Sequence, residues 1–282
     1  MFLAIVIFLL YFSIVYHEYG HFVEMRRLGV GVAEAGIGMP LGPRISYTPK
    51  NGKFSGVRLS FYLLTFFLGA FVKETREGGK KLASLSFVDK AEIFVAGPVK
   101  NIYVGCALLI LSIFVYAFFH ADPSWGWSAW AFYFFRALFV SPYGYLPLGT
   151  IVFLLCFKRV FATYLAPIFG AVCATLIAKS LFLGGFGPVV SSVVGPVGFV
   201  QVLSEQAVDI SSALYVASEL SLGLGALNLL PIFPLDGGQL FLPFIERLKI
   251  PFLVKAFQYG GLAILLLFLL LVTWRDIVAY VL

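Results

Sequence analysis

Residues 2–25 read FLAIVIFLLYFSIVYHEYGHFVEM, an almost unbroken apolar run that ends in a cluster of ionisable side chains. A helix needs about 20 apolar residues to cross the hydrocarbon layer of a membrane, and this run supplies them. No basic stretch precedes the run, and it leads directly into His17, Glu18 and His21 without a clear small-residue cleavage pattern. We therefore expect a retained membrane-spanning helix here and not a signal peptide.

The whole chain has the composition of a membrane protein. Hydrophobic residues make up 61% of its 282 residues and charged residues only 12%, against roughly 25% charged residues in an ordinary soluble domain. Such a composition leaves too few polar groups to keep a globule dispersed in water, and 31 Phe with 14 Tyr exclude a disordered chain. The net charge of +6 is explained by one basic loop, so we expect no nucleic-acid partner.

Further apolar stretches predict an all-α polytopic membrane protein of about six transmembrane helices. The clear candidate spans are residues 2–25, 93–119, 160–183, 213–230 and 254–273. A sixth, around 128–157, is interrupted by Ser141-Pro142 and Pro147, so we expect it to be kinked, split or partly re-entrant. We expect one membrane-embedded domain over 1–282, made of 1–119, an extra pair of spans over 120–194, and 195–282.

The basic residues predict the orientation of the spans. Twelve of the 20 Lys and Arg residues lie between Arg26 and Lys100, so the positive-inside rule assigns this loop to the cytoplasm. With six spans, both termini are then expected outside. Within the loop, residues 44–48 and 57–61 alternate apolar and polar side chains on either side of Asn51-Gly52. This pattern predicts a small cytoplasmic, membrane-associated β-hairpin.

The spacing of His17, Glu18 and His21 is typical of zinc hydrolases. Two histidines four residues apart on a helix project from one face, and Glu18 between them can reach the same point. On HExxH helices the two imidazoles bind zinc and the carboxylate is the general base. The alternative is that these are polar residues at the interfacial end of a span. However, residue 17 lies about 25 Å along the helix, where ionisable groups are costly unless they have a function.

A catalytic zinc site needs a third protein ligand and an open position. Asp236 is the candidate, in the sequence NLLPIFPLDGG at residues 228–238. Asp-Gly after two prolines is, taken alone, typical of a surface turn. The span 213–230 nevertheless runs towards the cytoplasm, so Asp236 is expected at the depth of the two histidines. Irregular backbone at that depth is tolerated where it is buried in protein or lines a wet cavity.

Together these motifs resemble the site-2 protease family of intramembrane zinc metalloproteases. The matching segments are HEYGH at 17–21, GPVKN at 97–101, and NLLP with LDGG within 228–238, with weaker matches at 69–73 and 195–198. Many members have a PDZ domain where this chain has residues 121–194, or a C-terminal CBS domain. We expect neither here, which makes the chain a compact member.

The resemblance implies a zinc metalloendopeptidase with one Zn²⁺ per chain. The ligands would be His17, His21 and Asp236, and the substrate a transmembrane protein cleaved within the lipid bilayer. The implied location is a bacterial cytoplasmic membrane, with the active site towards the cytoplasmic leaflet.

In this mechanism Glu18 accepts a proton from water and Asn228 stabilises the oxyanion, with Asn101 as a weaker candidate. Both Asn residues have packing or helix capping as an alternative role. The hairpin over 44–61 could hold an extended substrate by strand addition.

Two other classes of function stay open. An ion-coupled transporter fits the broken helices, and a catalytically silent scaffold of the same fold would bind membrane proteins without cleaving them. The sequence leaves the substrate, the cleavage position and the oligomeric state undetermined.

Overall fold

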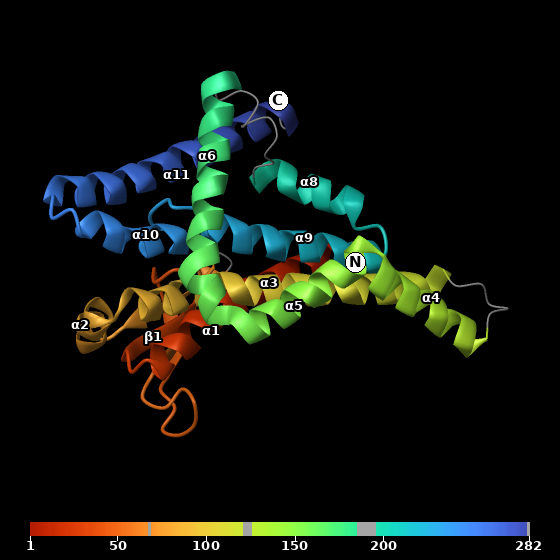
Figure 1. Ribbon diagram of the computed structural model, residues 1–282, viewed down its shortest axis with the longest axis horizontal. Coiled ribbons are helices and arrows are strands. Elements are labelled where there is room, and N and C mark those ends of the chain that lie inside the picture. Colours follow the sequence, from red (N-terminus) through yellow and green to blue (C-terminus); the bar gives the residue numbers. More distant parts are fainter. Residues whose placement is uncertain (67–68, 121–125, 185–195, 281–282) are drawn as a thin grey trace.

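The computed structural model describes residues 1–66, 69–120, 126–184 and 196–280, which form a helical bundle with a small β-sheet on one side (Figure 1). Within these ranges, five helical segments are long and apolar enough to cross a membrane. They are α1 (Phe2–Arg27), α3 (Phe87–His120), the run Gly144–Lys179, α9 (Ile210–Asn228) and α11 (Pro251–Tyr280). This confirms the predicted polytopic all-α fold with a small β element.

The region around the predicted sixth span is split at Ser141-Pro142, one of the expected outcomes, and the number of candidate spans falls as a result. Its helices are α4 (Trp127–Val140), α5 (Pro142–Val160), the π-helical turn η2 (Phe161–Leu165) and α6 (Ala166–Gly184). Helix α4 has 14 residues, about 21 Å of helix, which is too short to cross the hydrocarbon layer. It ends at Ser141, whose backbone is extended because a proline follows. Pro147, in contrast, lies inside α5.

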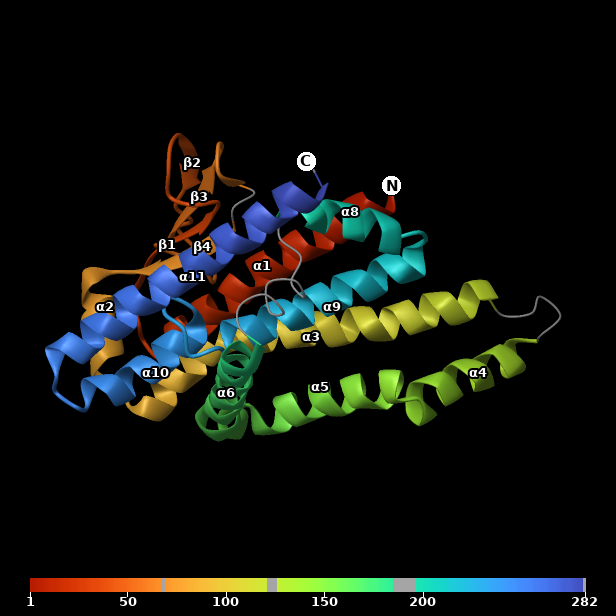
Figure 2. The same ribbon diagram turned by 90° about the horizontal axis from the view of Figure 1, so that it is seen from above.

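Helices α5 and α6 follow one another without a loop, but they do not share a direction. Phe157 has non-helical dihedrals (φ −125°, ψ 26°), and η2 follows it, so α6 turns sharply away from α5 (Figures 1 and 2). The predicted spans 128–157 and 160–183 thus yield a short helix and one bent candidate span. The count among the described residues is five instead of six.

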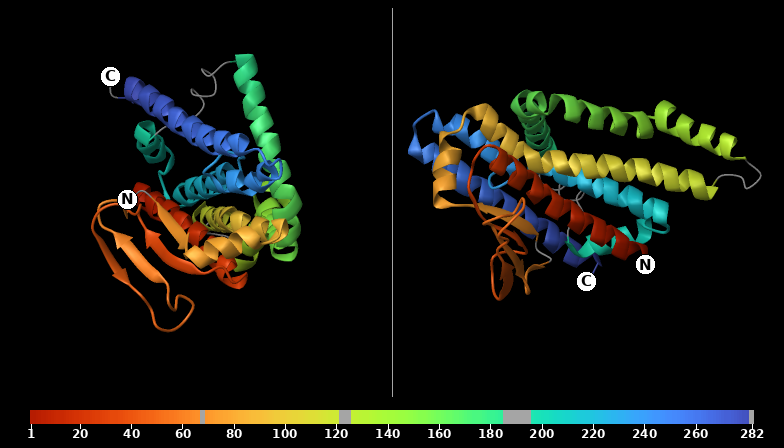
Figure 3. Two further views of the ribbon diagram at one scale, coloured as in Figure 1. Left: turned by 90° about the vertical axis from the view of Figure 1, so that its left-hand side faces the viewer. Right: turned by 90° about the horizontal axis from the view of Figure 1, so that it is seen from below.

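The start of α1 and the end of α11 lie at the same end of the bundle (Figures 2 and 3). The sheet, α2 (Arg76–Ser84) and α10 (Asp236–Glu246) lie towards the other end, whereas α8 (Pro196–Gln206) lies near the two termini (Figure 2).

The sheet has four strands in the order β2-β3-β1-β4. These are β1 (Val32–Ile37), β2 (Arg44–Tyr47), β3 (Arg58–Tyr62) and β4 (Ala70–Glu74). Strands β2 and β3 pair antiparallel, which confirms the predicted hairpin, and Gly52 in its connection has φ +85°. The added finding is that β1 and β4 extend the sheet. Strand β4 is an edge and packs against α1, whereas β2 is the opposite edge.

Helix α3 is the centre of the bundle and packs against α1, α9 and α5. Glycines allow its closest crossings. A Cβ at Gly20 of α1 would lie 2.6 Å from the Ala96 main-chain oxygen of α3, and one at Gly105 of α3 would lie 2.5 Å from Leu222 of α9. In lipid, where apolar contacts between helices bring no hydrophobic gain, such close backbone packing is the main source of helix association.

Buried acidic groups tie α5 to this central pair. Glu24 of α1 forms ion pairs with Arg27 and with Lys158 of α5, and Glu92 of α3 pairs with Arg27 and with Arg159 of α5. Glu24 and Glu92 are each only 6% exposed, so each needs a partner in order to stay ionised. The network joins three helices at one end of α1.

Replacing Lys158 by Met should lower the free energy of unfolding by about 1–3 kcal/mol. This lies between the value of an exposed ion pair and that of a fully buried one, because Glu24 keeps Arg27 as a partner. The measurement is the denaturation midpoint of the protein in detergent micelles. Lys179→Met is the matched control, because Lys179 is exposed on α6 and forms no ion pair within the described residues. Equal midpoints for the two variants would contradict the role of the network.

Candidate metal centre

The two histidines of the HEYGH segment lie one turn apart on α1 and face α3. Their Nε2 atoms are 3.1 Å apart. The side chains are buried, with His17 and His21 only 6% and 8% exposed. The helical period of 3.6 residues accounts for their common face.

Asp236 joins them from the other end of the chain. It is the first residue of α10, and its Oδ2 lies 3.0 Å from His17 Nε2 and 3.3 Å from His21 Nε2. The three ligand atoms all lie within 4.8 Å of one another. The structure thus brings together the three predicted ligands, although Asp236 lies more than 200 residues from the two histidines in sequence.

The glycines after Asp236 allow α10 to start directly against the preceding loop. A Cβ at Gly237 would lie 2.3 Å from the Leu229 main-chain oxygen, and one at Gly238 would lie 2.5 Å from the Ile232 carbonyl carbon. A larger residue at either position would push the start of α10 away from the end of α9. The two glycines of the LDGG segment therefore allow the close packing that sets the position of Asp236.

Gly97 of α3 lies directly beside the two imidazoles. A Cβ at this position would come within 2.3 Å of His21 Nε2 and 2.4 Å of His17 Nε2. Such distances are far below van der Waals contact, so only glycine leaves room at the metal-facing nitrogens. In the sequence, Gly97 belongs to GPVKN at 97–101, one of the segments that carry the family resemblance. Its place in the first third of α3, beside the two imidazoles, emerges only from the fold.

The donor set fits zinc. Two imidazole nitrogens and one carboxylate oxygen form a three-ligand catalytic site with one position left open. The Ile93 carbonyl lies 2.8 Å from His21 Nδ1 and can only accept, so His21 donates from Nδ1, the usual arrangement for a metal-bound histidine. The buried Asp236 Oδ2 accepts no hydrogen bond within the described residues. A cation at the centre of the three atoms would satisfy it.

Glu18 lies beside the same site, on the strand β4 side of α1. Its carboxylate lies near the Val72 main-chain N–H, and it is near enough to His17, His21 and Asp236 to interact with their charges. Glu18 was the predicted general base. Val72 is a contact that the sequence did not reveal.

The two predicted asparagines lie in different surroundings. Asn228, near the end of α9, is half-buried, and its Nδ2 donates to the Leu224 main-chain oxygen at 3.1 Å. Asn101 is fully buried and contacts His17, Ser13 and Ser221. The sequence offered one signal for Ser13, which lies four residues before His17 and so on the same helix face.

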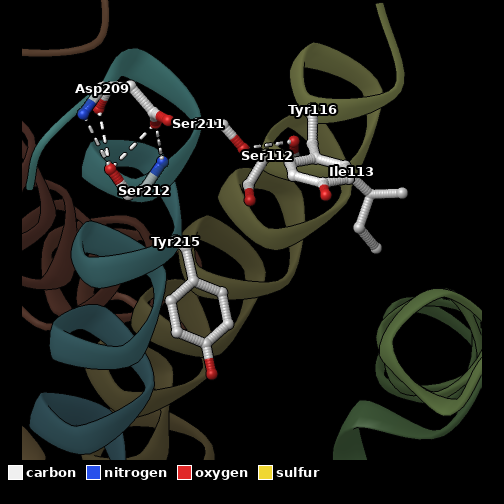
Figure 4. A pocket seen from close by; sticks show the side chains of 7 residues that line it. All are labelled: Ser112, Ile113, Tyr116, Asp209, Ser211, Ser212 and Tyr215. Carbon is white, nitrogen blue, oxygen red and sulfur yellow. Dashed lines mark hydrogen bonds between the residues drawn. The ribbon is translucent and has the colours of Figure 1, made fainter. Parts of the chain in front are cut away.

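A separate hollow lies between the last third of α3 and the start of α9 (Figure 4). Asp209 there accepts the Ser212 main-chain N–H at 2.7 Å, which holds the pKa of Asp209 below its usual range. Ser211 donates to the Ser112 main-chain oxygen. Ser112 lies about 16 Å along α3 from Asn101, so this hollow is separate from the metal ligands, and these polar groups pair with one another.

Comparison with known proteins identifies the family. A sequence model described as peptidase family M50 matches residues 5–272, nearly the whole chain. The chain belongs to peptidase family M50. This confirms the resemblance to the site-2 proteases. The zinc metalloprotease RasP of Shouchella clausii is 36% identical over 103 residues, which cover 34% of this M50 protein and 24% of that relative.

A second relative is the regulator of sigma-W protease RasP of Bacillus subtilis. It is 42% identical over 88 residues, which cover 29% of this M50 protein and 21% of the relative. The matched part thus spans about a quarter or less of the length of these relatives.

Proposed function

We propose that this M50 family member is an intramembrane zinc metalloendopeptidase, with one zinc per chain, that cleaves transmembrane proteins in or near their spans. The observation that carries the proposal is the convergence of His17, His21 and Asp236 beside Glu18 in an apolar helical bundle. Buried ionisable groups at this depth are costly unless they are used.

A zinc ion held by these ligands would lower the pKa of a bound water towards neutrality and polarise a carbonyl group. Glu18 accepts the proton of the attacking water and delivers it to the leaving amide nitrogen. Asn228 remains the proposed oxyanion donor. Its NH₂ group has two N–H donors, and the one that does not bond to the Leu224 carbonyl can serve the oxyanion.

An extended substrate segment can reach Glu18 along the free edge of β4. Gly38 N–H bonds to the Gly69 oxygen, so by the alternation of antiparallel pairs Phe71 and Lys73 also bond to β1. The backbone groups of Ala70, Val72 and Glu74 therefore point away from β1. Strand addition at this edge, rather than at the hairpin over 44–61, would align a peptide with Glu18.

The bundle supports the predicted orientation. The basic loop between α1 and α3 forms the sheet and α2, at the end of the bundle opposite the two termini (Figure 3). We propose that this end faces the cytoplasm and that both termini lie outside. With five candidate spans, this requires the bent run Gly144–Lys179 to begin and end on the same side of the membrane. The bacterial relatives support a location in the cytoplasmic membrane.

The experiment that tests the proposal is the zinc content of purified protein by elemental analysis. We expect about one zinc per chain in the wild type and almost none in Asp236→Ala, because two histidines alone leave the site incomplete. Asp209→Ala is the matched control, since Asp209 caps α9 away from the site, and it should keep its zinc.

Absence of zinc from folded wild type, even after zinc is supplied, would remove the hydrolase mechanism. The transporter or scaffold would then be favoured. Ion flux in reconstituted vesicles that persists after chelation would distinguish the transporter from the scaffold.

A further inference from the structure

A closed hydrogen-bond ring lies behind His17, on the side away from Asp236. The Nδ2 atom of Asn101 lies 2.9 Å from His17 Nδ1 and its Oδ1 atom 3.2 Å from Ser13 Oγ. Ser13 Oγ lies 2.5 Å from Ser221 Oγ, which in turn lies 2.8 Å from the Asn101 main-chain oxygen. Ser13, Asn101 and Ser221 are fully buried and come from α1, α3 and α9.

The number of protons determines how this ring is arranged. The main-chain oxygen of Asn101 can only accept, so the single Ser221 hydroxyl proton points to it. The proton in the short contact between the hydroxyls must then come from Ser13. Ser13 has no second proton, so the carboxamide end that faces it must be the donating NH₂ group. The two ends of a carboxamide have the same shape, and their partners decide which is which.

It follows that the two ends of the amide must be exchanged, so that the Asn101 oxygen faces His17 and its NH₂ group faces Ser13. A carboxamide oxygen can only accept, so His17 carries its proton on Nδ1 and keeps the lone pair of Nε2 for a metal. No other arrangement gives each of the four contacts a proton. His21 is held in the same tautomer by the Ile93 carbonyl. Two unprotonated nitrogens would then face each other and Asp236, and a cation relieves this repulsion.

We infer that Asn101 is a positioning residue that fixes His17 as a zinc ligand, and that Ser13 and Ser221 set the direction of its amide. The inference rests on the proposed zinc function. It replaces the prediction that Asn101 stabilises the oxyanion. Both ends of its amide are used within the ring, and its side chain is 0% exposed, so a substrate cannot reach it.

The test is the zinc dissociation constant of the full-length protein in detergent, measured by competition with a chromogenic chelator. Asn101→Leu removes the acceptor and should weaken zinc binding by roughly 10–100-fold, the usual cost of losing a partner behind a metal ligand. Asn101→Asp should stay within a few-fold of the wild type, because its carboxylate still accepts from Nδ1–H. Ser13 can turn its proton to the second carboxylate oxygen, which weakens the contact with Ser221 but leaves the acceptor behind His17 in place.

Two outcomes would overturn the inference. One is that Asn101→Asp binds zinc as weakly as Asn101→Leu, and the other is that Asn101→Leu binds zinc as tightly as the wild type. A wild type that binds no zinc would instead remove the proposed function itself. The unfolding midpoint of the zinc-free variants separates a folding defect from a binding defect.

If Asn101→Leu does not fold, the tautomer provides the decisive measurement. In ¹⁵N-histidine-labelled wild type loaded with zinc, the His17 ring, assigned by His17→Gln, should show a proton on Nδ1 that exchanges slowly with water. A His17 ring without that proton would overturn the inference.

Discussion

Replacing Glu18 by Gln should reduce peptide-bond cleavage by at least about 100-fold while the protein keeps its zinc, since general-base catalysis contributes roughly 10²–10⁴-fold. Gln has nearly the same shape as Glu, and its amide oxygen can still face the Val72 main-chain N–H. A neutral amide cannot, however, take a proton from water. The variant thus removes proton transfer and leaves the surroundings of the site intact.

Cleavage should be measured with a panel of tagged single-span membrane proteins reconstituted with the enzyme in vesicles. Glu219→Gln is the matched control, because Glu219 is exposed on α9, and it should cleave like the wild type. Substantial residual cleavage by Glu18→Gln would contradict the assigned role. Loss of zinc from the same variant would mean that Glu18 acts on the architecture of the site.

Replacing Gly97 by Ala should abolish zinc binding even though the residue carries no ligand atom. The added methyl carbon would lie 2.3 and 2.4 Å from the two Nε2 atoms, so either α3 must move away from α1 or the imidazoles must rotate. Both changes displace the nitrogens that would bind zinc. We expect a loss of affinity larger than the roughly 10–100-fold cost of removing an outer partner.

The control is Gly223→Ala on α9, where an added Cβ meets nothing within 4 Å. Because Ala also has a higher helix propensity than Gly, this control should be at least as stable as the wild type. Both proteins should be tested for zinc content and for the denaturation midpoint. Unchanged zinc affinity in a folded Gly97→Ala variant would falsify the close approach of α3 to the two histidines.

Much of the fold could be predicted because its signals are local. Hydropathy over about 20 residues marks a span wherever it occurs, and the hairpin of β2 and β3 follows from alternation around Asn51-Gly52. The number of spans over 128–183 could not be predicted because two prolines there had opposite effects. The proline after Ser141 ended a helix, whereas Pro147 was accommodated inside one, and the sequence around them does not distinguish the two cases.

The sequence by itself determined which side chains could bind zinc. His17, Glu18 and His21 are neighbours on any helix, because the helical period places residues four apart on one face. The pairing with Asp236 needed one further argument, from the direction of each span and the depth at which it ends.

Only the tertiary structure decided what surrounds these ligands. Gly97 beneath the imidazoles, the ring of Ser13, Asn101 and Ser221, and the edge of β4 beside Glu18 all depend on where α3 crosses α1 and α9. A crossing point is set by the fit of small residues on separate helices, and this information is distributed over segments far apart in the chain. Local periodicity and the direction of the spans therefore give the proposed metal ligands, and helix packing gives the groups that surround them.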